Sequence, residues 1–299
     1  MQIDPNFVQG LVSAVNQTQA NEQTYTNEIS TGVSVNNLSD NPVAAAQDYL
    51  LRSEISVNDS FVQSASTLES QMQVTDTALG SVVTQLTSAI SLATEGNNGT
   101  LSTSNVQAIA NQLSGIQNEI LSLANTSYQG QYVFGGSKTQ TAPFSLNTGT
   151  SPATVNYYGD GDIIYAVTPS GQKIQVNLAG DQVFGSGSSG VLASLGAVIH
   201  DLSTGAGTST VATDIANLSG SLQTVSNQRV ILDNGLSSLQ STSTYTQGQT
   251  AQLQSAEDAV VQTNTAQVAT DLSQTETQYT SLLDMIASLD AQPTLFKVL

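Results

Sequence analysis

Hydrophobic positions in the last forty residues repeat with spacings that alternate between four and three. This period is that of a helix face packed against another helix. It predicts one long helix that ends before Pro293 and is followed by the apolar tail 294–299. The repeat is formed by Val261, Thr265, Val268, Leu272, Thr275, Tyr279, Leu282, Ile286 and Leu289.

The first thirty residues also predict a helix. Asp4-Pro5 supplies an N-cap residue followed by Pro at the first helical position. Thr18 and Glu22 interrupt the apolar face. That face is formed by Phe7, Leu11, Val15, Tyr25 and Ile29. Residues 31–42 combine turn formers with Pro42 and predict a loop or hinge.

The interior of the chain contains the strongest helical repeats. Residues 43–94 carry more than four heptads of apolar positions between Phe61 and Ala93, and a second helix follows over 104–123. Further helices are predicted over 191–202 and 211–240. Beyond Thr242 the apolar repeat shifts register, which predicts a stutter or hinge before Val261.

Between these helices the pattern changes to short strands. Apolar and β-branched runs at 154–158, 162–167, 172–176 and 182–184 are separated by glycine-containing turns. We interpret the segment 159–162 (GDGD) as a hairpin turn, because a calcium loop needs more oxygen ligands at fixed offsets.

The predicted fold is therefore mainly α with a small antiparallel β insertion. Its N- and C-terminal helices would pair into an elongated helical bundle or coiled-coil rod, with the β part at the outer end. Three parts are expected: a terminal helical assembly domain (1–42 and 256–299), a helical rod (43–130 and 191–255) and a β-rich outer domain (131–190).

The charge of the chain excludes several partners. Five basic residues face 23 acidic ones, for a net charge of −18. Phosphate backbones and anionic membrane surfaces are bound through Lys and Arg, so neither nucleic acid nor membrane is an expected partner. No apolar run is long enough to span a bilayer. The N-terminal segment lacks the basic and apolar regions of a Sec signal peptide, so no cleaved signal is expected.

Candidate catalytic chemistry is sparse. Cysteine is absent and His200 is the single histidine, so a catalytic triad could use only His200. Its position suits a histidine at a helix C-terminus, and we expect no catalytic residue, metal or cofactor. Arg229 lies on an apolar helix stripe, where it either pairs with a carboxylate or carbonyls of another helix or extends from the core edge to solvent.

Several segments, in order, resemble the bacterial flagellin family. Ser30-Thr31-Gly32 and then 36–46 (NNLSDNPVAAA) resemble the signature near the start of these proteins, although Val35 and Asn41 replace its usual Ile and second Asp. Segment 131–144 (QYVFGGSKTQTAPF) resembles the region that leads into the variable part of the members at the hook–filament junction. Asn227-Gln228-Arg229 and the segment 256–299, ending LFKVL, are similar to the C-terminal half.

The resemblance implies a structural adaptor that joins hook to filament in the bacterial flagellum and assembles through its termini. The implied partners are other copies in a ring, a hook-associated protein on the hook side and flagellin, with an export chaperone as a further candidate. The implied location is extracellular, after export without a cleaved signal. The expected assembly interface comprises the five residues of the N-terminal face together with Val268, Leu272, Tyr279, Leu282, Ile286, Leu295, Phe296 and Leu299.

Three alternatives remain open at this point. A filament flagellin would have the same fold and differ in copy number and position. A secreted coiled-coil binding or fibre protein with a β head would have termini that are stable in the monomer. An enzyme would need His200 for its activity.

Overall fold

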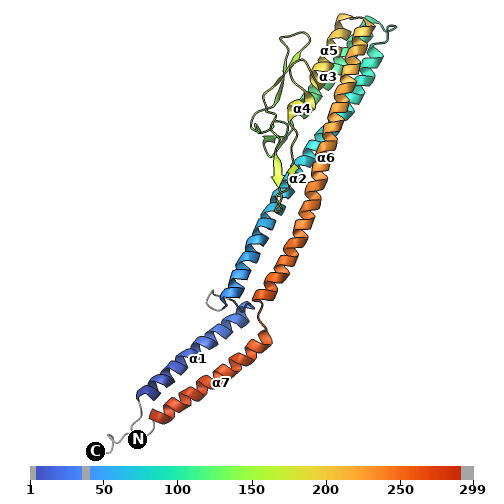
Figure 1. The fold of residues 1–299 in the computed structure, drawn as a ribbon. Helices are drawn as coiled ribbons and strands as arrows, with labels where there is room; N and C mark the ends of the chain where they lie inside the picture. The colour runs from blue at the N-terminus through green and yellow to red at the C-terminus, as the bar shows by residue number, and fades with distance from the viewer. Residues whose placement is uncertain (1–4, 36–40, 291–299) are drawn as a thin grey trace, which may run out of the picture. The chain divides into compact units, whose positions relative to one another are not determined.

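The computed structural model describes residues 5–35 and 41–290, which are mainly helical with small antiparallel sheets (Figure 1). No helix in these ranges is both long and apolar enough to cross a membrane. The helices are α1 (Pro5–Thr31), α2 (Pro42–Gly96), α3 (Thr103–Ala124), α4 (Gly180–Phe184), α5 (Val191–Thr204), α6 (Thr208–Val261) and α7 (Thr265–Asp290). The strands are β1 (Ser127–Tyr128), β2 (Gln131–Tyr132), β3 (Phe144–Asn147), β4 (Thr154–Tyr157), β5 (Tyr165–Val167) and β6 (Lys173–Gln175).

The chain forms two compact units, and α2 and α6 contribute to both. The terminal unit comprises residues 1–57 and 249–299, and the interior unit comprises 58–248. The terminal unit therefore extends past the expected limits at 42 and 256 into the adjacent parts of α2 and α6. The strands lie in the interior unit together with α3, α4 and α5.

The core of the interior unit lies between α2, α3, α5 and α6. The apolar repeat of α2 is buried as predicted, with Leu79, Val82 and Leu86 fully inaccessible to solvent. Helices α3 and α5 pack together, and the buried Gln117 side chain of α3 donates to the Leu192 carbonyl of α5 (2.9 Å). Heptad spacing thus places one continuous stripe of each long helix in the core.

The expected stutter in α6 is absent. The helix is unbroken to Val261, and Leu239, Ser243, Thr246 and Thr250 are all buried at spacings of four, three and four. The heptad register therefore continues through small polar residues. A prediction that follows only apolar residues does not identify these positions as part of the core.

The helical structure is interrupted instead at residues 262–264. The prediction of one long helix that includes Val261 is therefore wrong, because Val261 ends α6 and a separate helix begins at Thr265. The Asn264 side chain accepts a hydrogen bond from the backbone N–H of Gln267 (3.2 Å). Such a contact is typical of an N-cap, which starts a new helix at Thr265.

The β part consists of three two-stranded antiparallel hairpins: β1–β2, β3–β4 and β5–β6. The strand expected at 182–184 is wrong, because these residues belong to the short helix α4. Helix geometry here buries the Phe184 ring, whose centroid lies 5.0 Å from that of Phe134 and 5.3 Å from that of Phe144. Burial of these aromatic rings outweighs the local strand preference.

The expected hairpin turn at 159–162 is also wrong, because β4 pairs with the preceding β3 and β5 with the following β6. The Asp160 carboxylate instead binds the turn that follows β2. It accepts from the Ser137 hydroxyl, from the Ser137 backbone N–H (2.7 Å) and from the Asp162 N–H (3.3 Å). These hydrogen bonds, chiefly those from Ser137, lower the pKa of Asp160.

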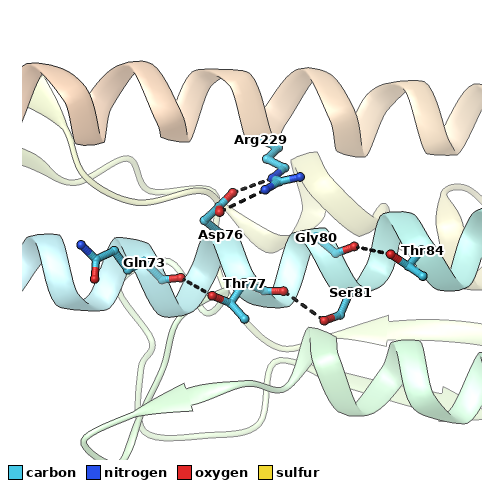
Figure 2. A network of polar contacts seen from close by, with 7 residues as sticks. All are labelled: Gln73, Asp76, Thr77, Gly80, Ser81, Thr84 and Arg229. Atoms are coloured by element: carbon cyan, nitrogen blue, oxygen red, sulfur yellow. Dashed lines mark hydrogen bonds and ion pairs between the residues drawn. The ribbon is translucent and has the colours of Figure 1, made fainter.

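Arg229 of α6 forms a bidentate ion pair with Asp76 of α2 (Figure 2). Its Nε donates to Oδ1 at 2.5 Å and its terminal nitrogen to Oδ2 at 3.1 Å. The two side chains are 39% and 26% exposed, so the pair lies at the edge of the helix seam. Burial and the Asp76 charge raise the pKa of the neighbouring Asp233, whereas Arg229 acts in the opposite direction.

A double-mutant cycle with Arg229→Met and Asp76→Asn should give a coupling free energy of about 1 kcal/mol, because a bidentate pair at a seam edge is only partly screened by solvent. Urea unfolding followed by circular dichroism measures it. The matched control is Arg52→Met with Asp48→Asn, since Arg52 is 58% exposed and pairs with Asp48 one helical turn away. That coupling should stay below about 0.5 kcal/mol. Equal couplings would contradict a specific role for Arg229.

A second electrostatic contact joins the end of α5 to the start of α6. Burial, the hydrogen bond with Asp201 and the Asp201 charge raise the pKa of Asp214 to about 6, from an ordinary value of 3.8. The folded state therefore holds a proton that the unfolded chain releases. The stability from this proton is complete below the unfolded pKa and is lost as the pH rises through about 6.

Asp214→Asn should consequently raise Tm at about pH 7.5 and raise it much less at about pH 4.5, because the amide needs no proton to sit beside Asp201. Thermal unfolding across this pH range provides the measurement. Asp59→Asn, at an exposed position of α2, serves as the control for a general charge effect. A gain in Tm that is the same at both pH values would contradict the assignment.

Candidate assembly interface

Helices α1 and α7 pack side by side in the terminal unit, although they stand at opposite ends of the sequence (Figure 1). Three contacts fix their direction. Gln19 donates to the Tyr279 hydroxyl (3.0 Å), the Thr263 hydroxyl donates to the Glu28 carboxylate (3.2 Å), and Val33 forms an antiparallel bridge with Gln262. Residue numbers rise on one helix as they fall on the other, so the pair is antiparallel.

Most of the residues expected at the assembly interface lie in the seam of this pair. On α1, Leu11 is buried and Val15 and Tyr25 are half-buried. On α7 all the expected residues from 268 to 286 are buried or half-buried, namely Val268, Leu272, Tyr279, Leu282 and Ile286.

Phe7 and Ile29 are 50% and 38% exposed. Each stands four positions from a residue of the stripe formed by Leu11, Thr18 and Tyr25, so both lie on the same face of α1, near its two ends, without being buried there. The expected tail residues Leu295, Phe296 and Leu299 lie outside the described residues. Whether any of these side chains enters an intermolecular contact stays a prediction.

The seam contains two buried threonines: Thr275, which belongs to the predicted repeat of the C-terminal helix, and Thr18, which the sequence pattern treats as an interruption. Thr18 is 7% exposed and Thr275 is 6% exposed. Their hydroxyls donate to carbonyls one turn earlier in the same helix, at 2.8 Å and 2.7 Å respectively. The hydroxyls are therefore satisfied without a partner across the seam. Such a seam buries less apolar surface than a leucine seam and is correspondingly less stable.

A backbone clip joins the two connections of the terminal unit, the one after α1 and the one before α7. Ser34 N–H and its hydroxyl donate to the Val261 carbonyl at 2.7 Å and 3.0 Å, and Thr263 N–H donates to the Gly32 carbonyl at 3.0 Å. Gly32 adopts a positive φ of 72°, which ends α1 at this point. The sequence predicts the connection after α1, within the loop expected at 31–42, but it does not predict the connection at 262–264.

Both helices of the pair also carry apolar side chains on their outer surfaces. Val12 of α1 is 50% exposed, and Leu283 and Met285 of α7 are 42% and 45% exposed. Two helices can bury only the faces that they share, so these side chains remain in water in the isolated chain.

The described residues contain no group of three or more His, Asp or Glu side chains placed to hold a metal ion. His200 Nδ1 lies 3.0 Å from the Ser151 hydroxyl. A groove of about 580 Å³ between α2 and the end of α3 includes Thr77 and Ser81, whose hydroxyls donate to carbonyls of α2 itself (Figure 2).

Thr275→Val should stabilise the α1–α7 pair by about 1 kcal/mol, because valine fills the same buried volume without a polar group. Limited proteolysis of the purified monomer, read at sites within residues 5–31 and 265–290, should slow accordingly. Thr270→Val is the matched control, since Thr270 forms the same hydrogen bond, to the Ala266 carbonyl, at an exposed position. Equal protection by both variants would show that helix propensity, rather than the seam, is responsible.

Comparison with known proteins identifies relatives for a large part of the chain. Residues 8–139 match the model of the bacterial flagellin N-terminal helical region. Flagellar hook-associated protein 3 of Escherichia coli is 29% identical over 180 residues, which are 60% of this chain and 55% of that protein. The Salmonella typhimurium protein of the same name is 29% identical over 176 residues, 58% of this chain and 54% of that protein. The chain spans about half the length of these curated relatives.

A solved structure extends the likeness to the fold. Flagellar hook-associated protein 3 of Legionella pneumophila superposes with a TM-score of 0.63 at 16% identity, over 71% of this chain and 98% of that one. The helical architecture with its small sheets is thus shared where little sequence identity remains. Residues 8–139 are thus similar to the N-terminal helical region of bacterial flagellins, and the curated proteins that the chain resembles are hook-associated proteins 3.

Proposed function

We propose that this chain is a structural adaptor of the bacterial flagellum, which joins hook to filament and assembles through α1 and α7. The observation that carries the proposal is the terminal pair, which has a partly polar seam and keeps apolar side chains exposed on both helices. The names of the curated relatives favour a junction protein over a filament flagellin. The same relatives disfavour a secreted fibre protein of another class, and the proposed role requires no enzymatic activity.

The energetic logic follows from the two faces of the pair. In the isolated chain, α1 and α7 gain only the burial of their shared seam, which includes Thr18 and Thr275. In an assembly the outer side chains of both helices would be removed from water as well. Association would therefore provide the free energy that the pair lacks alone, at the cost of ordering its segments.

The expected partners are other copies in a ring, the hook-associated protein on the hook side and flagellin, with an export chaperone as a further candidate. A net charge of −18 makes copies repel one another, so their contacts must rely on apolar burial more than on charge. The location would be extracellular, at the junction, after export without a cleaved signal. The tail residues Leu295, Phe296 and Leu299 are part of the proposed interface.

Immunogold labelling of intact flagella should place the protein in a single band at the boundary of hook and filament. Leu283→Ser with Met285→Ser should remove that band while the purified monomer keeps its helical content, because neither side chain belongs to the seam. Losing the burial of about 1.5–3 kcal/mol for each side chain reduces incorporation by at least roughly tenfold.

Val167→Ser is the matched control, since Val167 is 58% exposed on β5 and lies outside the terminal unit. It should leave the band unchanged. Label along the whole filament would indicate a filament flagellin, and a normal band with the double variant would contradict assembly through the outer face of α7.

A further inference from the structure

We propose that the Asn98–Gly99 turn between α2 and α3 is a site of spontaneous modification, at which Asn98 converts to aspartate and isoaspartate through a succinimide. Both residues are exposed, and a Cβ added at Gly99 would meet no atom within 4 Å. An asparagine followed by glycine is open to this reaction because no side chain shields the attacking backbone nitrogen. The chain contains a second such pair, Asn234–Gly235, in α6.

The turn activates the Asn98 side chain. Its Oδ1 accepts hydrogen bonds from the Thr100 hydroxyl (2.9 Å) and from the Thr100 backbone N–H (3.3 Å). Two donors on this oxygen withdraw electron density from Cγ and stabilise the negative charge that forms there during attack. Thr100 is thus a positioning residue for the reaction.

The nucleophile is equally available. Across residues 41–290, the Gly99 N–H donates no hydrogen bond, whereas its neighbours hold the turn: Asn98 N–H donates to the Glu95 carbonyl and Leu101 N–H donates to the Asn98 carbonyl, both at 3.1 Å. The amide can therefore be deprotonated and rotated without loss of a structural contact.

The chemistry balances with water as the sole co-reactant. Hydroxide removes the proton of Gly99 N, and this nitrogen forms a bond to Asn98 Cγ. The tetrahedral intermediate collapses, the bond from Cγ to Nδ2 breaks, and Nδ2 takes a proton and leaves as ammonia. Water then opens the cyclic imide at either carbonyl, which gives aspartate or isoaspartate. No oxidant, metal or enzyme is required.

The second pair provides a control within the same molecule. Gly235 lies inside α6, where its N–H is committed to the helix, and a Cβ at this position would lie 2.5 Å from the Gln175 carbonyl oxygen. Helical geometry and close packing keep the nitrogen away from the Asn234 side chain. Identical dipeptides in one chain are thus expected to differ in reactivity because of their structure alone.

The product would alter a defined place in the interior unit. Asn98 lines a cavity of about 300 Å³ together with Asn97, Asp201 and Leu202. A carboxylate at residue 98 adds a negative charge to the cavity that Asp201 also lines, and Asp201 already shares a hydrogen bond with Asp214. Isoaspartate also lengthens the backbone between α2 and α3. The modified fraction would therefore increase with the time since synthesis. The modification would also destabilise the interior unit near the turn between α2 and α3.

The test incubates the folded full-length chain in mildly alkaline buffer and follows both sites by peptide mapping with mass spectrometry. Residue 98 should gain the mass of an NH₂-to-OH exchange and yield both isomers, while Asn234 stays unchanged. In urea the two sites should react at similar rates. Gly99→Ala should suppress the reaction at residue 98 without changing the helical content, because its Cβ meets no neighbour.

Thr100→Val should slow the reaction by roughly threefold to tenfold, less than the ~10²-fold seen in water-excluded sites, and Thr100→Ser should restore it. If residue 98 stays unmodified in the folded chain over the interval in which Asn234 reacts in urea, the proposal is overturned. Equal rates for Thr100→Val and Thr100→Ser would remove the role assigned to the hydroxyl and with it the proposed activation.

Discussion

The seam of each long helix has to keep one register over its whole length, and the other features of the fold adapt to this constraint. In α2 most buried positions hold apolar residues, and in the first part of α6 they hold leucine and valine. Further along α6 the same positions hold Ser243, Thr246 and Thr250, and the buried Thr250 hydroxyl has no hydrogen-bond partner. The helix continues because the spacing is preserved, although the apolar content and the stability per turn decrease.

In the pair formed by α1 and α7, the apolar content of the seam is lower still. Threonines in its seam satisfy their hydroxyls within their own helix, so they fit the helix interface without strengthening it. Its outer surfaces meanwhile carry apolar residues such as Val12 and Met285. A helix pair with a weak inner seam and several apolar side chains on its outer surface is suited to a structure that is completed by neighbours, which is the physical basis of the proposed adaptor.

The sequence predicts those features that depend on local spacing. The apolar repeat of α2, the start of α1 at Pro5 and most of the α7 seam follow from periodicity and capping. The sequence does not predict features that depend on contacts between distant residues. Tertiary packing decides that Arg229 pairs with Asp76 and that Asp160 binds Ser137. It also decides that Phe184 lies in a helix. The burial of Thr18 is not predicted from the sequence, because a polarity scale counts its hydroxyl and ignores its methyl group, which packs like those of valine.

The clip between Gly32–Ser34 and Val261–Thr263 has a consequence for the order of folding. Its Ser34–Val261 contact joins residues 227 positions apart, and the Gln19–Tyr279 contact of the pair joins residues 260 apart. Closing loops of this length in an unfolded chain costs entropy that a few hydrogen bonds cannot return. Contacts of such high sequence separation form slowly, and they form only after shorter-range contacts have reduced the distance. We therefore expect α1 and α7 to be the last helices to pair during folding and the first to separate.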